Sequence, residues 1–192
     1  MKNILSTIIL FLGITLSTFA QSFTLLDSEV GWKGKAAFNA YALSGMVELN
    51  QADFQGSKEE LTTAKIVMDM TTIQSDNARL IQHLKSKDFF EVKRYKEATF
   101  IMKSKLNLQE GKQEISGDLT IKDSTHPISF PVELKQEGEK WSMEGIMSID
   151  RTQYGITFNS PTYFEKLKEQ AIADEFELSF SLTIGQQAAA MR

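Results

Sequence analysis

The sequence predicts an all-β fold built from about eight antiparallel strands. Hydrophobic and polar residues alternate over long stretches, which puts every second side chain on one face of a strand. Short polar breaks that contain a glycine separate alternating stretches at residues 110–112 and 137–139, a pattern typical of antiparallel hairpins. Parallel strand–helix–strand units are not indicated. Each predicted strand therefore has one dry face that must be buried.

The predicted strands follow one another along most of the chain. The most regular one covers residues 176–184, where Phe, Leu and Ile alternate with Glu, Ser and Thr. Other stretches alternate cleanly or somewhat less regularly. The clean ones are residues 41–49, 115–121, 128–134 and 141–149, and the less regular ones are residues 32–40, 65–73 and 98–106.

Two segments interrupt the alternation, and both carry helical signals. Residues 75–95 contain aliphatic side chains at helical spacing, followed by the apolar pair Phe89-Phe90, which predicts a helical lid or plug. Residues 160–170 begin with Ser160 as an N-cap and a proline at the first helical position. This second pattern predicts one further short helix with an amphipathic character.

Residues 1–20 have the pattern of a secretory signal peptide. Lys2 precedes an apolar run over residues 4–19, and small residues surround a cleavage position after Ala20. A membrane anchor is the competing interpretation, but Ser, Thr and Gly interrupt the run and no basic cluster follows it. We expect cleavage, which leaves residues 21–192 as a single domain.

The composition argues against several function classes. The chain has 192 residues, of which 42% are hydrophobic and 24% charged, as expected for one globular domain. Its formal net charge of −4 provides no basic surface for nucleic acid. It has no cysteine, which excludes disulfides, thiol catalysis and cysteine-ligated metals. The two histidines, His83 and His126, lie in different elements without the spacing of metal ligands, so no metal site is predicted.

The dry faces can be buried in two ways. A sandwich of two sheets and a closed barrel are the economical solutions, and closure also removes exposed sheet edges. A barrel of about eight strands is either filled by its own side chains or holds one small ligand. Met and Phe are frequent on the dry faces, and flexible Met suits a pocket, but such a stripe also forms ordinary cores. The residues alone leave a filled and a hollow interior open.

Several motifs, taken together and in this order, resemble the YceI-like family of secreted bacterial proteins. The motifs spread over roughly residues 23–184, and the ordered set is specific although each piece is weak. They are Ile73-Gln74-Ser75-Asp76-Asn77-Ala78, the run from His83 to Val92, Tyr95 with Ala98-Thr99-Phe100, the run from Gly117 to Lys122 with Thr125-His126-Pro127-Ile128, and Arg151-Thr152-Gln153-Tyr154-Gly155-Ile156.

The resemblance implies an eight-stranded, lipocalin-like barrel around an apolar channel, and a periplasmic protein that binds a long isoprenoid, isoprenoid quinone or fatty chain. It brings no catalytic residue, metal or cofactor, and the implied partner is an apolar, lipid-like small molecule. Together with the dry faces, it predicts that channel and lid are lined by Phe38, Leu43, Met68, Met70, Leu80, Leu84, Phe89, Phe90, Phe100, Met102, Leu119, Ile121, Phe130, Val132, Met143, Met147, Phe176 and Phe180.

The chain departs from the family pattern near the lid. Leu80-Ile81 stands where members often carry Arg-Asp, Lys96 stands where a proline often follows the tyrosine, and Asp123 replaces a usual glycine. Two aliphatic residues in place of a charged pair should make the channel mouth more apolar. We therefore expect a change in the accepted head group.

An enzyme is one alternative to a binding protein. An enzyme acting on an isoprenoid lipid would need an acid–base or nucleophilic group inside the barrel, and none of the assigned inward positions supplies one. Asp118, Asp150 and Arg151 fall at polar positions or strand ends, where solvated charges are the default. Asp88 and Arg151 either pair to fasten the lid or are two exposed charges.

Further alternatives concern assembly and the membrane. An interaction module with a filled core stays open, as does a homodimer. An outer-membrane barrel is disfavoured by the polar tail over residues 186–192 and by the lack of aromatic girdles. The preferred prediction is a binding protein that is neither an enzyme nor an integral membrane protein.

Overall fold

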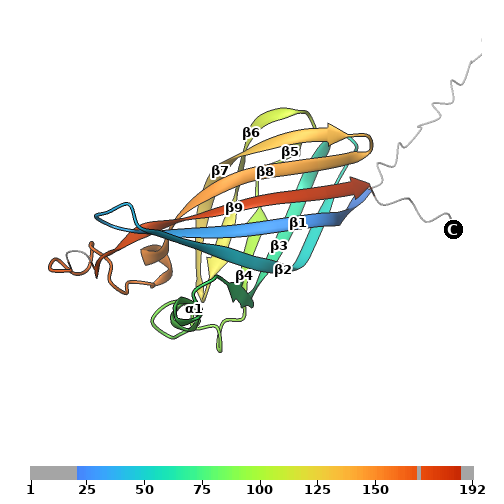
Figure 1. The fold of residues 1–192 in the computed structure, drawn as a ribbon. Helices are drawn as coiled ribbons and strands as arrows, with labels where there is room; N and C mark the ends of the chain where they lie inside the picture. Colours follow the sequence, from blue (N-terminus) through green and yellow to red (C-terminus); the bar gives the residue numbers. More distant parts are fainter. Residues whose placement is uncertain (1–20, 168–169, 187–192) are drawn as a thin grey trace, which may run out of the picture.

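The computed structural model describes residues 21–167 and 170–186, which form one antiparallel sheet closed into a barrel (Figure 1). The strand order is β2-β1-β9-β8-β7-β6-β4-β3-β5, and an additional pairing of β2 with β3 closes a ring of eight strands. The predicted eight-stranded antiparallel barrel is thus confirmed. The predicted signal peptide, residues 1–20, lies outside the described residues.

Most strands are longer than the alternating stretches suggested, because the hydrogen-bonded ladder continues past the regular part of the pattern. The pairing of the long strands contains register shifts, as between β1 and β9. The strands are β1 (Gln21–Ala36), β2 (Ala42–Gly56), β3 (Glu60–Gln74), β4 (Glu97–Met102), β5 (Leu106–Asn107), β6 (Gly111–Ile121), β7 (Ser124–Glu137), β8 (Lys140–Asp150) and β9 (Ile172–Gln186).

One predicted hairpin is present and the other is not. Gly138 has a positive φ of 62°, and the pairing of Glu137 with Lys140 makes residues 138–139 a two-residue turn between β7 and β8. The break at residues 110–112, in contrast, joins β5 to β6, which are not paired with each other. Leu106 of β5 pairs with Leu61 of β3, so the predicted strand over residues 98–106 is split in two.

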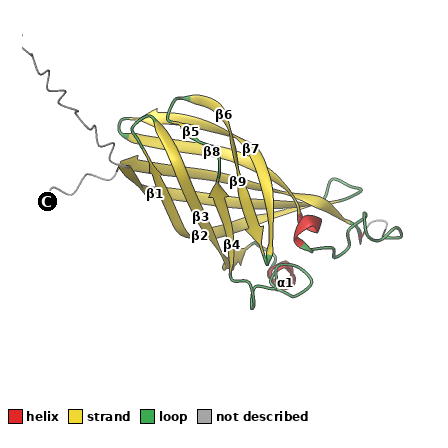
Figure 2. Ribbon diagram, turned by 180° about the vertical axis from the view of Figure 1, so that it is seen from behind, coloured by secondary structure: helices red, strands yellow, loops and turns green. Residues whose placement is uncertain are grey.

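The lid segment, residues 75–95, begins with the predicted helix, α1 (Ala78–Leu84). Asn77 caps this helix, since its side chain accepts a hydrogen bond of 3.0 Å from the backbone N–H of Leu80. The helix and the turns after it lie at one end of the barrel (Figure 2). Lys85 ties the segment to β3 by donating a 2.6 Å hydrogen bond to the carbonyl of Thr71.

The further helix predicted over residues 160–170 is wrong for the part that is described. Residues 161–167 form turns, with one helix-like hydrogen bond of 3.0 Å from the Phe164 N–H to the Ser160 carbonyl. Tyr163 and Phe164 are 57% and 51% exposed, so the expected apolar face is packed against nothing that would hold a short helix together. A 3₁₀ turn, η1 (Arg151–Tyr154), precedes this segment.

The two ends of the barrel differ in how they are filled. At the end where β1 starts and β9 finishes, side chains such as Phe23, Leu61, Leu134 and Ile184 are at most 4% exposed and fill the interior. The opposite end carries the β1–β2 loop, the lid segment and the turns after β8 (Figure 1). No helix within the described parts of the chain is both long and apolar enough to cross a bilayer.

Candidate functional site

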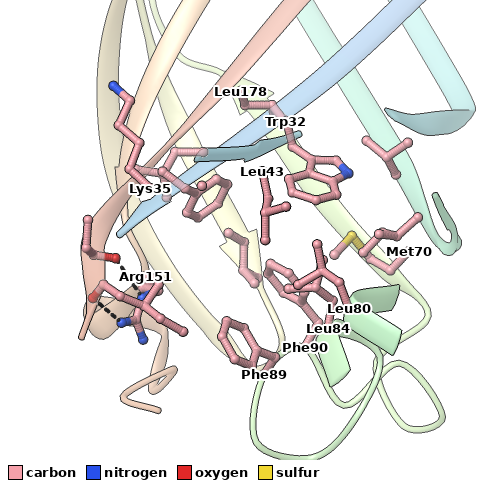
Figure 3. Close-up of a pocket in the computed structure, with 18 of the residues that line it drawn as sticks. Trp32, Lys35, Leu43, Met70, Leu80, Leu84, Phe89, Phe90, Arg151 and Leu178 are labelled. Atoms are coloured by element: carbon pink, nitrogen blue, oxygen red, sulfur yellow. Dashed lines mark hydrogen bonds between the residues drawn. The ribbon is translucent and has the colours of Figure 1, made fainter. Parts of the chain in front are cut away.

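A cavity of about 350 Å³ lies inside the barrel at the end covered by the lid segment. Leu80 and Leu84 of α1, with Phe89-Phe90, face Leu43 of β2 across it (Figure 3). Its remaining walls come from β1, β3, β4, β6, β8 and β9, from Arg151 and from residues 170–171 before β9. The volume is at the lower end of the range for small-molecule sites, and the lining is mainly aliphatic and aromatic.

A second, smaller cavity of about 50 Å³ lies deeper in the barrel. All of the side chains that line it are hydrophobic, and Phe130 packs between Phe100 and Phe180 at ring-centroid distances of 5.4 and 5.7 Å. The two cavities share only Met68 and Leu178 among their lining residues. These two side chains therefore form the boundary between them.

Inward-facing glycines leave room for aromatic rings against the barrel wall. Gly145 pairs with Phe180 across the β8–β9 ladder, and a Cβ at Gly145 would lie 2.6 Å from the Phe180 ring. Gly45 pairs with Trp32, and a Cβ there would lie 1.8 Å from the carbonyl oxygen of Gln74 and 2.7 Å from the indole, so both the backbone of β3 and the ring require a glycine. Each ring thus lies over a position that has no side chain, so it takes up less of the interior.

An aromatic cluster fastens the lid segment to the turns after β8. The Phe89 ring lies 5.0 Å from His83 of α1 and 5.7 Å from Phe158, and His83 lies 4.5 Å from Phe158. The guanidinium of Arg151 lies 5.8 Å from the centroid of the Phe89 ring, within the range of a cation–π contact. The lid segment is therefore held in place by contacts between aromatic rings and by one cation–π contact.

Arg151 is 3% exposed and is held mainly by backbone carbonyls. Its Nε, Nη1 and Nη2 donate to the carbonyls of Ala173 (3.0 Å), Ile156 (2.7 Å) and Ile172 (2.9 Å), and Nη2 also lies 3.5 Å from Asp174 Oδ1. Burial lowers the pKa of this guanidinium, and the carboxylates of Asp174 and Asp150 oppose that shift. The predicted pairing of Asp88 with Arg151 is wrong, because the carboxylate partner of Arg151 is Asp174. The alternative of two exposed charges holds for Asp88, which is exposed, but not for Arg151, which is buried.

Asp150 caps the 3₁₀ turn that carries Arg151. Its Oδ1 accepts hydrogen bonds from the backbone N–H of Thr152 (2.9 Å) and from the Thr152 hydroxyl (2.6 Å). Burial, the largest single influence, would raise the pKa of this carboxyl, but the hydrogen bonds from Thr152 and Gln153 together with the charge of Arg151 lower the pKa on balance. The charged side chain of Asp150 thus positions η1 as a capping group.

Few polar groups reach the first cavity. Lys35, Arg151 and Gln170 are among its lining residues, and Lys35 also forms an ion pair with Glu177. The indole Nε1–H of Trp32 is buried without an acceptor among the described residues. In the described ranges, no group of three or more His, Asp or Glu side chains is arranged to hold a metal ion. His83 packs against aromatic rings, and His126 lies 5.1 Å from the Tyr154 ring.

Most side chains expected to line the channel border one of the two cavities. Phe38 does not: β1 ends at Ala36, so Phe38 falls in the β1–β2 loop and is 68% exposed. Val132 is 1% exposed but borders neither cavity. The first cavity is bordered by Leu43, Met68, Met70, Leu80, Leu84, Phe89, Phe90, Leu119, Ile121 and Phe176, and the second by Met68, Phe100, Met102, Phe130, Met143, Met147 and Phe180.

Several lining residues were not among those expected. Trp32, Val47, Ile73 and Leu178 border the first cavity. Val47 and Leu178 lie at dry-face positions of predicted strands, so the alternation contained the signal that would have found them. Arg151 could not be found this way, because a charged residue after a strand is ordinarily exposed.

A closed antiparallel barrel with an apolar cavity beneath a helical lid has the architecture of the lipocalin-like barrels. The chain belongs to the YceI-like domain family, which matches residues 22–184. Among sequence relatives, UPF0312 protein VPA0850 of Vibrio parahaemolyticus is 30% identical over 105 residues, covering 53% of this chain and 56% of the relative. UPF0312 protein PputW619_0484 of Pseudomonas putida is 26% identical over 146 residues, covering 70% of this chain and 76% of the relative. The chain thus spans little more than half the length of the first of these relatives.

Solved structures share the fold at low sequence identity. A polyisoprenoid binding domain from Saccharophagus degradans, described as implicated in plant cell wall breakdown, has a TM-score of 0.66 at 12% identity and covers 87% of this chain and 99% of its own. BcnA of Burkholderia cenocepacia has a TM-score of 0.64 at 22% identity and covers 81% and 95%. At these identities the likeness concerns the fold.

Proposed function

We propose that this protein binds one elongated apolar molecule, an isoprenoid, isoprenoid quinone or fatty chain, inside the barrel. The observation that carries the proposal is the apolar cavity of about 350 Å³ under the lid segment. The printed description of the Saccharophagus degradans domain as polyisoprenoid binding supports the same class of ligand. The chain of the ligand lies in the cavity, and any head group lies at the mouth beside Lys35.

Hydrophobic transfer supplies enough affinity for such a ligand. Each buried methylene contributes about 0.8 kcal/mol, so each added isoprene unit contributes roughly 4 kcal/mol before the cost of ordering the chain. The few polar contacts offered by the cavity are consistent with binding of this kind. No reaction is part of the proposal, since Lys35 is paired with Glu177 and Arg151 with backbone carbonyls.

We further propose that the protein carries or buffers its ligand in the periplasm, after removal of residues 1–20. The apolar run after Lys2 supports export, and a barrel that shields an apolar chain suits transfer through an aqueous compartment. Fractionation of cells expressing the full chain tests this part. Recovery of the uncleaved protein from the cytoplasm would overturn it.

Native mass spectrometry of the protein, before and after incubation with farnesol or palmitate, tests binding. We expect a defined mass increase that disappears in Ala98→Phe, because Ala98 borders the first cavity and a ring there would fill it. Ile101→Phe is the matched control, since Ile101 lies on the same strand and is 41% exposed. A protein that takes up neither probe, or an equal loss in both folded variants, would contradict the proposal.

A further inference from the structure

The first and second cavities meet at two side chains. Met68 of β3 and Leu178 of β9 border both cavities, and they are 5% and 6% exposed. β3 and β9 are separated by β2 and β1 in the ring, so the two side chains reach the junction from different parts of the barrel wall. The path from the lid into the depth of the barrel passes between them.

The deeper cavity is a chemically uniform space. Every side chain that borders it is aliphatic, aromatic or a thioether, so a water molecule placed there would find none of the two to four polar partners it needs. Its volume of about 50 Å³ is enough for a few carbon atoms. An apolar chain end fits this chemistry.

Access to the deeper cavity comes from the first one. The wall around it consists of paired strands and, where β5 and β6 are not paired with each other, of the buried side chains of Leu106 and Ile115. Beyond it, buried side chains such as Leu61, Leu134 and Ile184 fill the far end of the barrel. A chain that enters under the lid can therefore be extended only past Met68 and Leu178. Ligand length and the position of these two side chains are then coupled.

The two side chains differ in how they can respond. Met68 is unbranched and has three rotatable bonds, so it can turn along the wall at small cost. It is opposite Ala98 on β4 and Leu49 on β2, and the small Ala98 side chain leaves room on one side. Leu178 is branched and lies opposite Trp32 and Met147 in its ladders. Met68 is thus the movable member of the pair.

We propose that Met68, with Leu178, sets the chain length that the barrel accepts, and that the deeper cavity is a second subsite for the end of a long chain. With Met68 across the path, the first cavity holds a short chain. When Met68 turns aside, the two spaces join and a longer chain reaches the deeper one. This inference rests on the proposed binding function and adds a specificity-determining residue to it.

The test compares affinities for a series of prenols, namely geraniol, farnesol, geranylgeraniol and solanesol, measured by displacement of a fluorescent fatty acid. Met68→Ala opens the junction, and we expect it to raise affinity for geranylgeraniol relative to geraniol by about tenfold, the effect of roughly two further buried methylenes. Met68→Phe should lower the same ratio. Met70→Ala is the matched control, because Met70 lies on the same face of β3 but borders only the first cavity.

Met68→Leu keeps the side-chain volume but loses flexibility, so it should fold even if the other Met68 variants do not. We expect it to bind geraniol as the unaltered protein does and to bind geranylgeraniol more weakly. A ratio that is the same in the Met68 variants and in Met70→Ala would overturn the inference while leaving the binding function intact. If none of the prenols displaces the probe from the unaltered protein, the proposed function itself fails.

Discussion

Truncating Phe89 should loosen the lid segment without unfolding the barrel. Phe89 is 6% exposed, and its ring partners are His83, Phe90 and Phe158, with Arg151 at 5.8 Å. All four lie in the lid segment, in η1 or in the turns that follow it, outside the paired strands. Phe89→Ala therefore removes packing between the lid segment and the turns that hold it in place.

The size of the effect follows from buried aromatic truncation. Replacing a buried Phe by Ala costs roughly 3 kcal/mol at the low end, and the low end applies because the ring already borders open space. If the whole loss falls on lid closure, the open fraction of the lid rises by about a hundredfold. A bound probe that leaves through the lid should dissociate faster by about the same factor.

Two measurements separate lid loosening from general destabilisation. Hydrogen exchange should accelerate at the lid amides of Phe90 and Val92, which donate to the carbonyls of Leu84 and Lys85, but not in the strands. Stopped-flow dissociation of a fluorescent fatty acid should speed up in Phe89→Ala. It should not change in the control Phe164→Ala, since Phe164 is 51% exposed. Equal acceleration of exchange in lid and strands, or an unchanged dissociation rate, would refute the reasoning.

Three further changes probe the barrel and its turns. Leu119→Asp places an unpaired charge at a position that is 0% exposed, and we expect loss of the cooperative thermal transition. Gly145→Ala drives a methyl group to 2.6 Å from the Phe180 ring, which should lower stability by about 1–3 kcal/mol in denaturant titrations. The pKa of Asp150 is lower in the folded state than in the unfolded chain, so its stabilising contribution is complete above about pH 4 and is lost as the pH falls through the folded pKa. Asp150→Asn should reduce that acid-dependent part of the unfolding free energy, and an identical pH profile in the variant would contradict the assignment.

The strands and the lid helix were predictable because their causes are local. Alternation places the dry face of a strand wherever the strand lies, and residues such as Ile115 and Leu119 are buried as predicted. The spacing of Leu80 and Leu84 likewise identified α1. The wrong helix over residues 160–170 shows the limit of this approach: a cap and an apolar spacing are not enough when no surface receives the helix.

Two features of the site depend on residues that are far apart in the chain. Arg151 is buried because backbone carbonyls of residues 156, 172 and 173 surround it. The rings of Trp32 at the first cavity and Phe180 at the second lie over glycines on neighbouring strands. Neither arrangement leaves a mark in the local pattern of the sequence.

Periodicity thus identifies which side chains point inward, since that depends on the local backbone alone. It cannot tell how much space those side chains leave, because free volume is the difference between the size of the closed ring and the summed volumes of side chains from all eight strands. The hollow interior, and its division at Met68 and Leu178, therefore emerged only when the strands were assembled.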